Sequence, residues 1–280
     1  MSSASRAWAF LTVFSLLFIG VGHLAAGRQG LLWALVLSLA FNALVYFLGD
    51  SRLFMQFFGT DLQGQDPWKV RSLTSDIAKK ARMQMPHIKI INSKSPQAFA
   101  LGRSWNHGTL FLTQGLLDRL TTDELQAVVA YLMATIKRQD TFVFSIGSFL
   151  IWLTLSVTSF FDTLFRWILG ASKKSHSLQS QFFTSLFSPA ISFLLRLTVS
   201  PNSYFLIDSL AASWIDSPKD LASAIWKLDT YSRTIPFNTT ASTSHFFIVS
   251  PLTEKNWKRY FISHPNIETR IQRLIGYYPI

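Results

Sequence analysis

The stretch LTTDELQAVVAYLMATIKRQD, residues 120–140, decides how the chain is organised. Its apolar residues recur at intervals of three and four, which is the period of a helix with one buried face. They are Leu125, Val128, Val129, Leu132, Met133 and Ile136. Thr121 followed by Glu124 is a capping-box start, and the basic 137–138 pair suits the C-terminal end of a helix dipole. The pattern predicts a helix that starts just after Thr121.

The same stretch resembles the active-site helix of the HtpX-like membrane zinc metallopeptidases. The pattern of that family is roughly L-T-x-D-E-L-x-A-V-L-A-H-E-x-x-H-I-K-x-R-D, and its flanks are retained here. The His-Glu-x-x-His core is not retained: Tyr131 stands at the first His, Leu132 at the Glu and Thr135 at the second His. In the family the two His bind zinc and the Glu serves as general base. A neutral phenol, a hydrocarbon and a hydroxyl do not suit these roles.

The family supplies a third ligand from a later pattern, R-E-Y-x-A-D. The matching stretch here is SYFLID, residues 203–208, and alignment on Asp208 puts the ligand position at Tyr204. The resemblance therefore implies degenerate positions, no catalytic residue, no metal ligand and no bound zinc. The chain has no Cys. Its His residues are His23, His87, His107, His176, His245 and His264, with no pair at the i, i+4 spacing of a zinc helix.

Other motifs extend the resemblance over residues 50–280. The stretch QAFALG, residues 97–102, resembles the family's N-A-F-A-x-G, and SHFFIVSPL, residues 244–252, resembles H-L-F-I-x-x-P-L. Residues 263–274 resemble T-H-P-x-x-x-x-R-I-x-x-L. The implied fold is an α+β membrane protein with transmembrane helical hairpins and a mostly helical zincin-like (gluzincin) domain that contains a small β-sheet.

The alternating, β-branched residues 86–91 and the stretch 108–113 predict strands of that sheet. In the resembled peptidases the strand pair borders the substrate cleft, and an exposed edge can receive a peptide as an added strand. The candidate substrate-binding edge consists of Thr109, Leu110, Phe111, Leu112 and Thr113. The alternative is that these strands only complete a small sheet over the helix.

Composition indicates an integral membrane protein. The 280 residues include 25 Phe and 9 Trp, and only 15% of residues are charged. The net charge of +11 could indicate nucleic acid, but the basic residues are interspersed with acids. Attraction to anionic lipid headgroups and a bias of positive charge towards the cytoplasm explain it better. We therefore expect a lipid bilayer as partner and no nucleic acid.

Long uncharged runs predict the membrane segments. Residues 7–27 and 30–49 are separated by only two residues, which favours a helical hairpin over a cleaved signal peptide. Asn42 lies within the second run and is expected to face another helix. Residues 142–161 form a third run. Residues 178–200 either cross the bilayer or lie at its interface with Arg196 reaching the headgroups.

These segments divide the chain into four parts. Residues 1–49 are a transmembrane hairpin, residues 50–140 the first part of the metallopeptidase-like domain, residues 141–200 a second membrane hairpin and residues 201–280 the remainder of the domain. An even number of spans places both soluble parts on one side. Because they carry most of the 26 Lys and Arg, that side is expected to be cytoplasmic, in a multi-pass protein of the bacterial inner membrane.

Three functions are compatible with these patterns. The first is a pseudopeptidase that acts in membrane-protein quality control by binding, either to other membrane proteins or to a membrane protease complex. The second is an active zinc endopeptidase with an unorthodox site, drawing for example on His264 and Glu268. The third is a structural membrane protein whose former cleft is filled by Tyr131, Leu132, Met133 and Tyr204.

Overall fold

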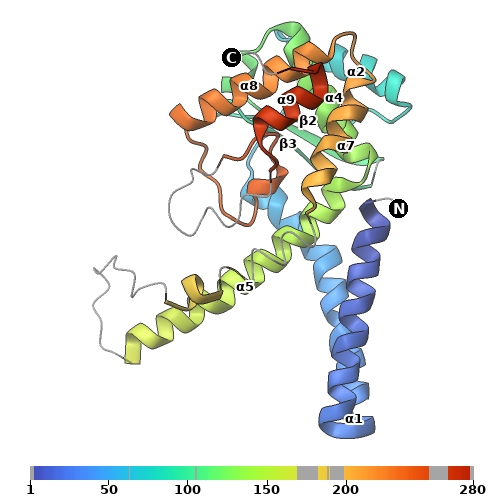
Figure 1. Cartoon of the computed structure of the whole chain (residues 1–280), viewed down its shortest axis with the longest axis vertical. Coiled ribbons are helices and arrows are strands. Elements are labelled where there is room, and N and C mark those ends of the chain that lie inside the picture. The colour runs from blue at the N-terminus through green and yellow to red at the C-terminus, as the bar shows by residue number, and fades with distance from the viewer. Residues whose placement is uncertain are drawn as a thin grey trace.

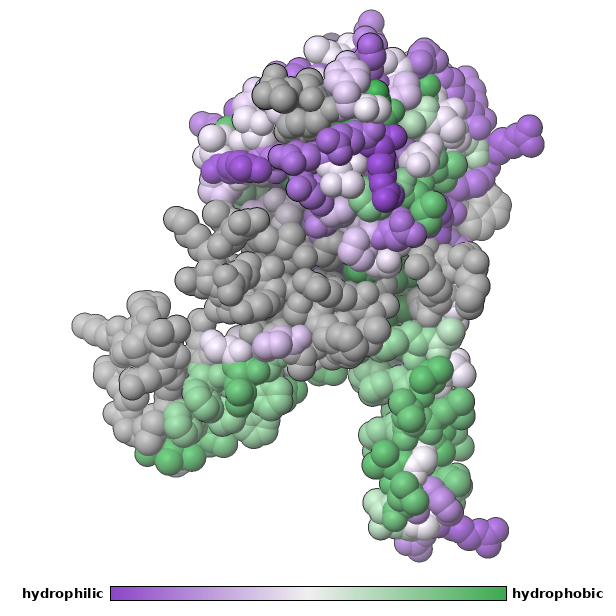
Figure 2. All heavy atoms as spheres, viewed as in Figure 1, coloured by the Kyte–Doolittle hydropathy of each residue, from purple (hydrophilic) through white to green (hydrophobic). Residues whose placement is uncertain are grey.

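The structure is a computed structural model that describes residues 3–62, 64–104, 106–168, 182–187, 189, 199–251 and 264–277. A rounded domain carries two long helical projections, and the chain's N-terminus lies beside the base of that domain (Figure 1). The projections have hydrophobic surfaces, whereas much of the visible domain surface is hydrophilic (Figure 2). This contrast matches a domain in water that is attached to apolar membrane segments.

The first projection is α1, Ser3–Gln56, and it is a hairpin. Its two arms meet at Ala26 and Gly27, where the backbone leaves helical geometry and Gly27 takes a φ of 57°. The two arms approach closely at Gly22 and Gly30: a Cβ added to Gly30 would collide with the carbonyl oxygen of Gly22. The side-chain amide of Asn42 donates to the hydroxyl of Ser15 at 3.0 Å, which confirms that Asn42 faces the other arm. The second arm ends at Gln56, further on than the expected exit at residue 49.

The second projection is α5, Asp140–Ile168. Two segments of the described chain are long and apolar enough to cross a membrane, Trp8–Phe47 and Asp140–Phe165. They differ in packing: 6% of the most apolar 18-residue stretch of the first segment is buried within the protein, compared with 61% for the second. The beginning of α5 packs on α1 through a small apolar cluster that includes Leu11, Val45 and Phe142. Most of the predicted segment 178–200 lies outside the described residues.

The domain contains a four-stranded sheet with the order β1-β2-β4-β3. The strands are β1 Thr60–Asp61, β2 His87–Ile91, β3 Ala98–Ser104 and β4 His107–Thr113. Strand β4 pairs in parallel with β2 and antiparallel with β3. The proposed peptide-binding edge at 109–113 is therefore wrong: β4 has a partner on each side, so its backbone has no free edge to offer a peptide.

The edge on that side is β3, and its outer face is already engaged at Phe99 and Gly102. Phe99 forms an isolated bridge with Phe247, and the carbonyl of Gly102 accepts a hydrogen bond from the Thr141 hydroxyl at 2.6 Å. An added peptide strand would have to displace these contacts, which are made by segments far from β3 in the sequence.

Helices from both soluble parts of the chain build one core around the sheet. Helix α4 packs against helices α2, α7 and α8 and against β3. Figure 1 shows α7, α8 and α9 gathered around α4, although the membrane segments separate them in sequence. The helices of the domain are α2 Val70–Ala81, α3 Gln114–Leu117, α4 Thr122–Lys137, α7 Pro201–Ala212, α8 Pro218–Thr234, the short 3-10 helix η2 Ser244–Phe246 and α9 Ile267–Ile275.

Candidate functional site: the tyrosine cluster on helix α4

Helix α4 starts as its sequence predicts. The Thr121 hydroxyl accepts from the Glu124 backbone N–H at 3.3 Å, and the Glu124 carboxylate accepts from the Thr121 N–H at 3.0 Å. The Glu124 carboxylate also accepts from Ser223 at 2.6 Å and pairs with Lys227 at 2.7 Å, which ties α4 to α8. Burial alone would raise the pKa of Glu124, but these partners outweigh it and lower the pKa.

The middle of α4 is enclosed. Tyr131, Leu132 and Thr135 are each at most 3% exposed. The Thr135 hydroxyl donates to the carbonyl of Tyr131 at 2.9 Å, so it is engaged within its own helix. Burial raises the pKa of Tyr131 well above its ordinary value, which keeps the phenol protonated and neutral. None of these three side chains therefore offers a metal ion an anionic oxygen or an imidazole nitrogen as ligand.

Helix α7 brings Tyr204 to the same place. The residue is fully buried, and its hydroxyl donates to the carbonyl of His245 at 2.9 Å. Its ring centroid lies 4.6 Å from that of His264 and 5.8 Å from that of Phe144. Tyr204 is therefore held by a hydrogen bond and by rings on two sides, in a position where it acts as a packing residue.

A buried guanidinium connects the two tyrosines. Arg270 of α9 is fully buried and makes two hydrogen bonds to the Asp208 carboxylate, at 2.9 and 2.7 Å. A third bond of 2.6 Å goes to the carbonyl of Ile248. The guanidinium carbon lies 5.4 Å from the ring centroid of Tyr131 and 5.9 Å from that of Tyr204. We call Tyr131, Tyr204, Asp208 and Arg270 the tyrosine cluster.

The charge of this cluster is internally balanced. Burial lowers the pKa of Arg270, but the facing Asp208 carboxylate outweighs that effect and raises the pKa above its ordinary value. The pair is bidentate and Nη1 of Arg270 also donates to the Ile248 carbonyl, which is the geometry in which a buried ion pair is tolerated. The sequence analysis did not single out Arg270 as a site residue. Asp208 aligns with the Asp of the R-E-Y-x-A-D pattern, and Arg270 aligns with the Arg of the T-H-P-x-x-x-x-R-I-x-x-L pattern.

Two histidines complete the surroundings. The Nε2 atoms of His245 and His264 lie 2.8 Å from the carbonyls of Phe144 and Phe247, respectively. Burial lowers the pKa of His245 to about 4 and that of His264 to about 3, so both rings are neutral. Glu268, named with His264 as a possible unorthodox site, is exposed at the start of α9. The structure does not bring the two side chains together in a hydrogen bond or ion pair.

Comparison with known proteins identifies the class. A profile of Peptidase family M48 matches residues 65–277, which is most of the chain. The chain therefore belongs to this family, and its HtpX-like character, predicted from sequence, is confirmed.

Individual relatives agree. A "Protease HtpX homolog" of Thermodesulfovibrio yellowstonii is 30% identical over 271 residues, covering 95% of this chain and 94% of the relative. Another, from Desulforapulum autotrophicum, is 28% identical over 98% of this chain and 90% of its own length. The crystal structure of S. mikatae Ste24p matches with a TM-score of 0.50 at 15% identity, over 98% of this chain and 65% of that longer one. This structural likeness shows the fold, and the predicted α+β membrane architecture is confirmed.

These findings correct the prediction that zinc is absent. HtpX and Ste24 homologues of family M48 are zinc metallopeptidases, so family membership points to zinc. The side chains at the positions aligned with the family's zinc ligands fit a zinc ion poorly. Tyr131 presents a neutral phenol, the Tyr204 hydroxyl donates to the His245 carbonyl, and Asp208 is engaged by Arg270. Within the part of the chain that the structure describes, no three His, Asp or Glu side chains form a metal-binding group.

Proposed function

We propose that this HtpX-like membrane protein acts by binding other proteins and does not hydrolyse peptides at helix α4. The observation that carries the proposal is the closed tyrosine cluster. Leu132 stands where a general base is needed, and it is 1% exposed in a hydrocarbon environment. Tyr131 is a neutral phenol, and the Tyr204 hydroxyl donates a hydrogen bond to the His245 carbonyl. Activation of water requires a group that can accept a proton, and this arrangement supplies none.

The retained architecture supports a role for the domain as a whole. The capping box, the Glu124 contacts to α8 and the Arg270 network are all in place around the changed positions. A membrane protein with this fold is suited to hold segments of other membrane proteins, or to associate with a membrane protease complex. We place it in membrane-protein quality control, in the bacterial inner membrane with the domain on the cytoplasmic side. The bias of Lys and Arg towards the soluble parts supports this orientation.

The competing function is zinc-dependent endopeptidase activity, and the family to which the chain belongs favours it. The two functions differ in the fate of a bound polypeptide. The purified full chain in lipid nanodiscs is mixed with a fluorescent, unfolded membrane-protein segment, with added zinc and with or without a chelator. Binding measured by anisotropy, with the segment recovered intact in both arms, supports the proposal. Fragments that appear with zinc and vanish with the chelator overturn it, as does an absence of binding.

A further inference from the structure

An open pocket of about 840 Å³ lies on the face of the sheet opposite helix α4. Alternation along the strands places its residues. His87 of β2 pairs with Thr109 of β4, and His107 lies two residues earlier on β4, so these three side chains share one face. All three line the pocket. Gly108 faces the other way, because a Cβ there would meet the side chain of Ile136 on α4.

The membrane hairpin forms the other wall of this pocket through Tyr46 and Phe54 of α1. Phe54 covers the neighbouring part of the same sheet face, with its ring centroid 5.8 Å from that of Phe111. Tyr46 lies next to Phe47, the last residue of the first candidate span, and its ring is 6.4 Å from Trp8 at the start of that span. Trp and Tyr concentrate at membrane–water interfaces. The pocket therefore lies at the level of the lipid headgroups.

The lining combines hydrogen-bond donors with an apolar side. Ser104, Asn106 and Thr109 contribute hydroxyl and amide groups, and the Ser104 hydroxyl lies 3.3 Å from Nδ1 of His107. Met85 is 43% exposed and Tyr46 is 38% exposed, so apolar surface remains uncovered beside these polar groups. An amphiphile that has a polar head and an acyl chain matches both parts.

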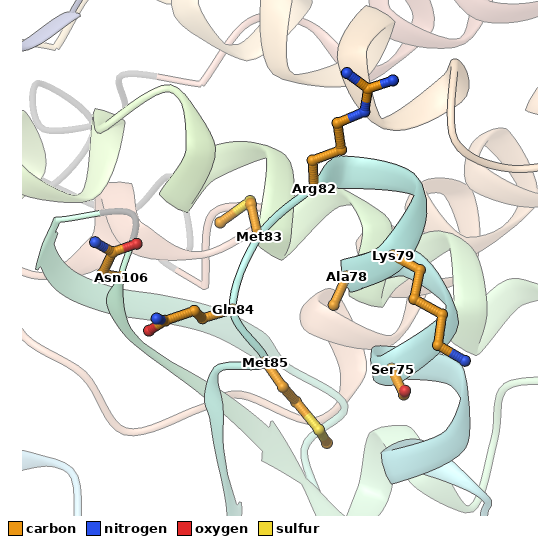
Figure 3. Close-up of a pocket in the computed structure, with 8 residues that line it drawn as sticks. All are labelled: Ser75, Ala78, Lys79, Arg82, Met83, Gln84, Met85 and Asn106. Atoms are coloured by element: carbon orange, nitrogen blue, oxygen red, sulfur yellow. The ribbon is translucent and has the colours of Figure 1, made fainter.

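Positive charge lies next to this pocket. A second open pocket of about 530 Å³ shares Gln84, Met85 and Asn106 with the first and adds Lys79 and Arg82 of the α2 end. Figure 3 shows Gln84 pointing towards Asn106, while the side chains of Lys79 and Arg82 extend away from that pair. Lys79 and Arg82 therefore line the adjoining second pocket, on the side away from Gln84 and Asn106. Lys79 faces Asp76 at 3.8 Å in an exposed pair, which neutralises little of its attraction for an anion.

We propose that the pocket between α1 and the His87–His107 face of the sheet binds the phosphate headgroup of an anionic phospholipid. The hydroxyl, amide and imidazole groups donate hydrogen bonds to the phosphate, Lys79 and Arg82 attract its charge, and Tyr46, Phe54 and Met85 contact the glycerol and upper acyl chains. Among the described residues that line the two pockets, none is acidic. This site is separate from the tyrosine cluster and does not depend on the proposed function.

The test uses the purified full chain in neutral detergent. Binding of short-chain phosphatidylglycerol, short-chain phosphatidylcholine and inorganic phosphate is measured by native mass spectrometry and calorimetry. We expect phosphatidylglycerol to bind at least about fivefold more tightly than phosphatidylcholine, since one basic group near an anionic lipid contributes roughly that factor. Equal affinities for the two lipids would overturn the proposal. Inorganic phosphate binding as tightly as phosphatidylglycerol would do the same, because it would indicate a small-anion site.

Variants localise the effect. His87→Glu with His107→Glu puts two negative charges into the pocket at exposed positions and is expected to abolish the preference for phosphatidylglycerol. Lys219→Glu changes the net charge by the same amount at an exposed position on α8 and should leave affinity within about twofold. Ser104→Phe fills the pocket without changing charge and should also prevent binding. Equal losses in the pocket variants and in Lys219→Glu would show diffuse attraction to a basic protein and would refute a pocket.

Discussion

The two faces of the sheet differ in how they treat polar groups. On the α4 side, Tyr204, Asp208 and Arg270 are each at most 3% exposed, and each has a partner within the protein. On the α1 side, His87 and His107 are exposed around an open pocket. A closed network stabilises the fold and leaves no room for a ligand, whereas an open polar pocket remains available for one. In this protein the positions aligned with the family's motif are enclosed, and the sheet face beside the α1 hairpin is open.

The largest effect of breaking the closed side is expected from Asp208→Asn. It leaves the buried charge of Arg270 without its counter-charge, which costs about 3–5 kcal/mol of unfolding free energy. Chemical denaturation in detergent measures this loss. The matched control is Asp229→Asn, whose partner Arg233 is 75% exposed, and it should cost less than about 1 kcal/mol. Similar small losses for both would show that the cluster is not the anchor described here.

Acid should weaken the closed side next. The pKa of His245 is about 4 in the folded protein against an ordinary value of 6.5, so the unfolded chain binds its proton first. The contribution is fully present above pH 6.5 and is lost as pH falls towards 4, by about 3 kcal/mol. Melting temperatures measured from pH 7 to pH 4 should fall less steeply in His245→Asn. The same substitution at the exposed His87 should leave the slope unchanged, and equal slopes in all three proteins would contradict this origin.

The two tyrosines should respond differently to loss of their hydroxyl groups. Tyr204→Phe leaves the His245 carbonyl without this donor and should cost about 1–3 kcal/mol. Tyr131→Phe should cost less than about 1 kcal/mol, because a Phe ring keeps the contact between the Tyr131 ring and the Arg270 guanidinium. Denaturation of the two variants in parallel makes the comparison. A larger loss of stability in Tyr131→Phe than in Tyr204→Phe would contradict the role assigned to the Tyr204 hydroxyl.

The smallest effect is expected at the start of α4. Thr121→Ala removes the side-chain half of the capping box and should cost about 1 kcal/mol. Thr230→Ala, within the exposed surface of α8, is the control and should stay within about 0.5 kcal/mol. Neither variant should change binding of phosphatidylglycerol, since both lie away from the open pocket. A changed lipid affinity in Thr121→Ala would mean that the two faces are coupled.

Local patterns predicted much of this fold. The capping box, the α4 period and the alternating strand at 86–91 depend on neighbouring residues, and each appears within a few positions of its expected place. The hairpin also followed from two apolar runs separated by a short break. The sheet order was not predicted, because the parallel pairing of β2 with β4 joins strands that are not consecutive in the chain and leaves β4 inside the sheet.

The site was predictable only in part. Alignment to the family's motifs brought Tyr131 and Tyr204 to attention, and the structure places both beside one guanidinium. Arg270 and Asp208 are 62 positions apart in the sequence, so the residues around either one do not predict that the two form a pair. The open pocket is lined by residues of α1, β2, β3 and β4, which are distant in sequence, so no single stretch of the sequence encodes it.

The central claim is that helix α4 in this protein does not catalyse peptide hydrolysis. Its most direct test is a cleavage assay on the wild-type full chain saturated with zinc, with an unfolded casein-type substrate and enzyme in excess. A purified HtpX homologue that retains the His-Glu-x-x-His motif serves as positive control. We predict chelator-sensitive fragments from the control and none from this protein. Chelator-sensitive cleavage by the wild-type chain that is lost in Tyr131→Phe or Tyr204→Phe variants would contradict the account.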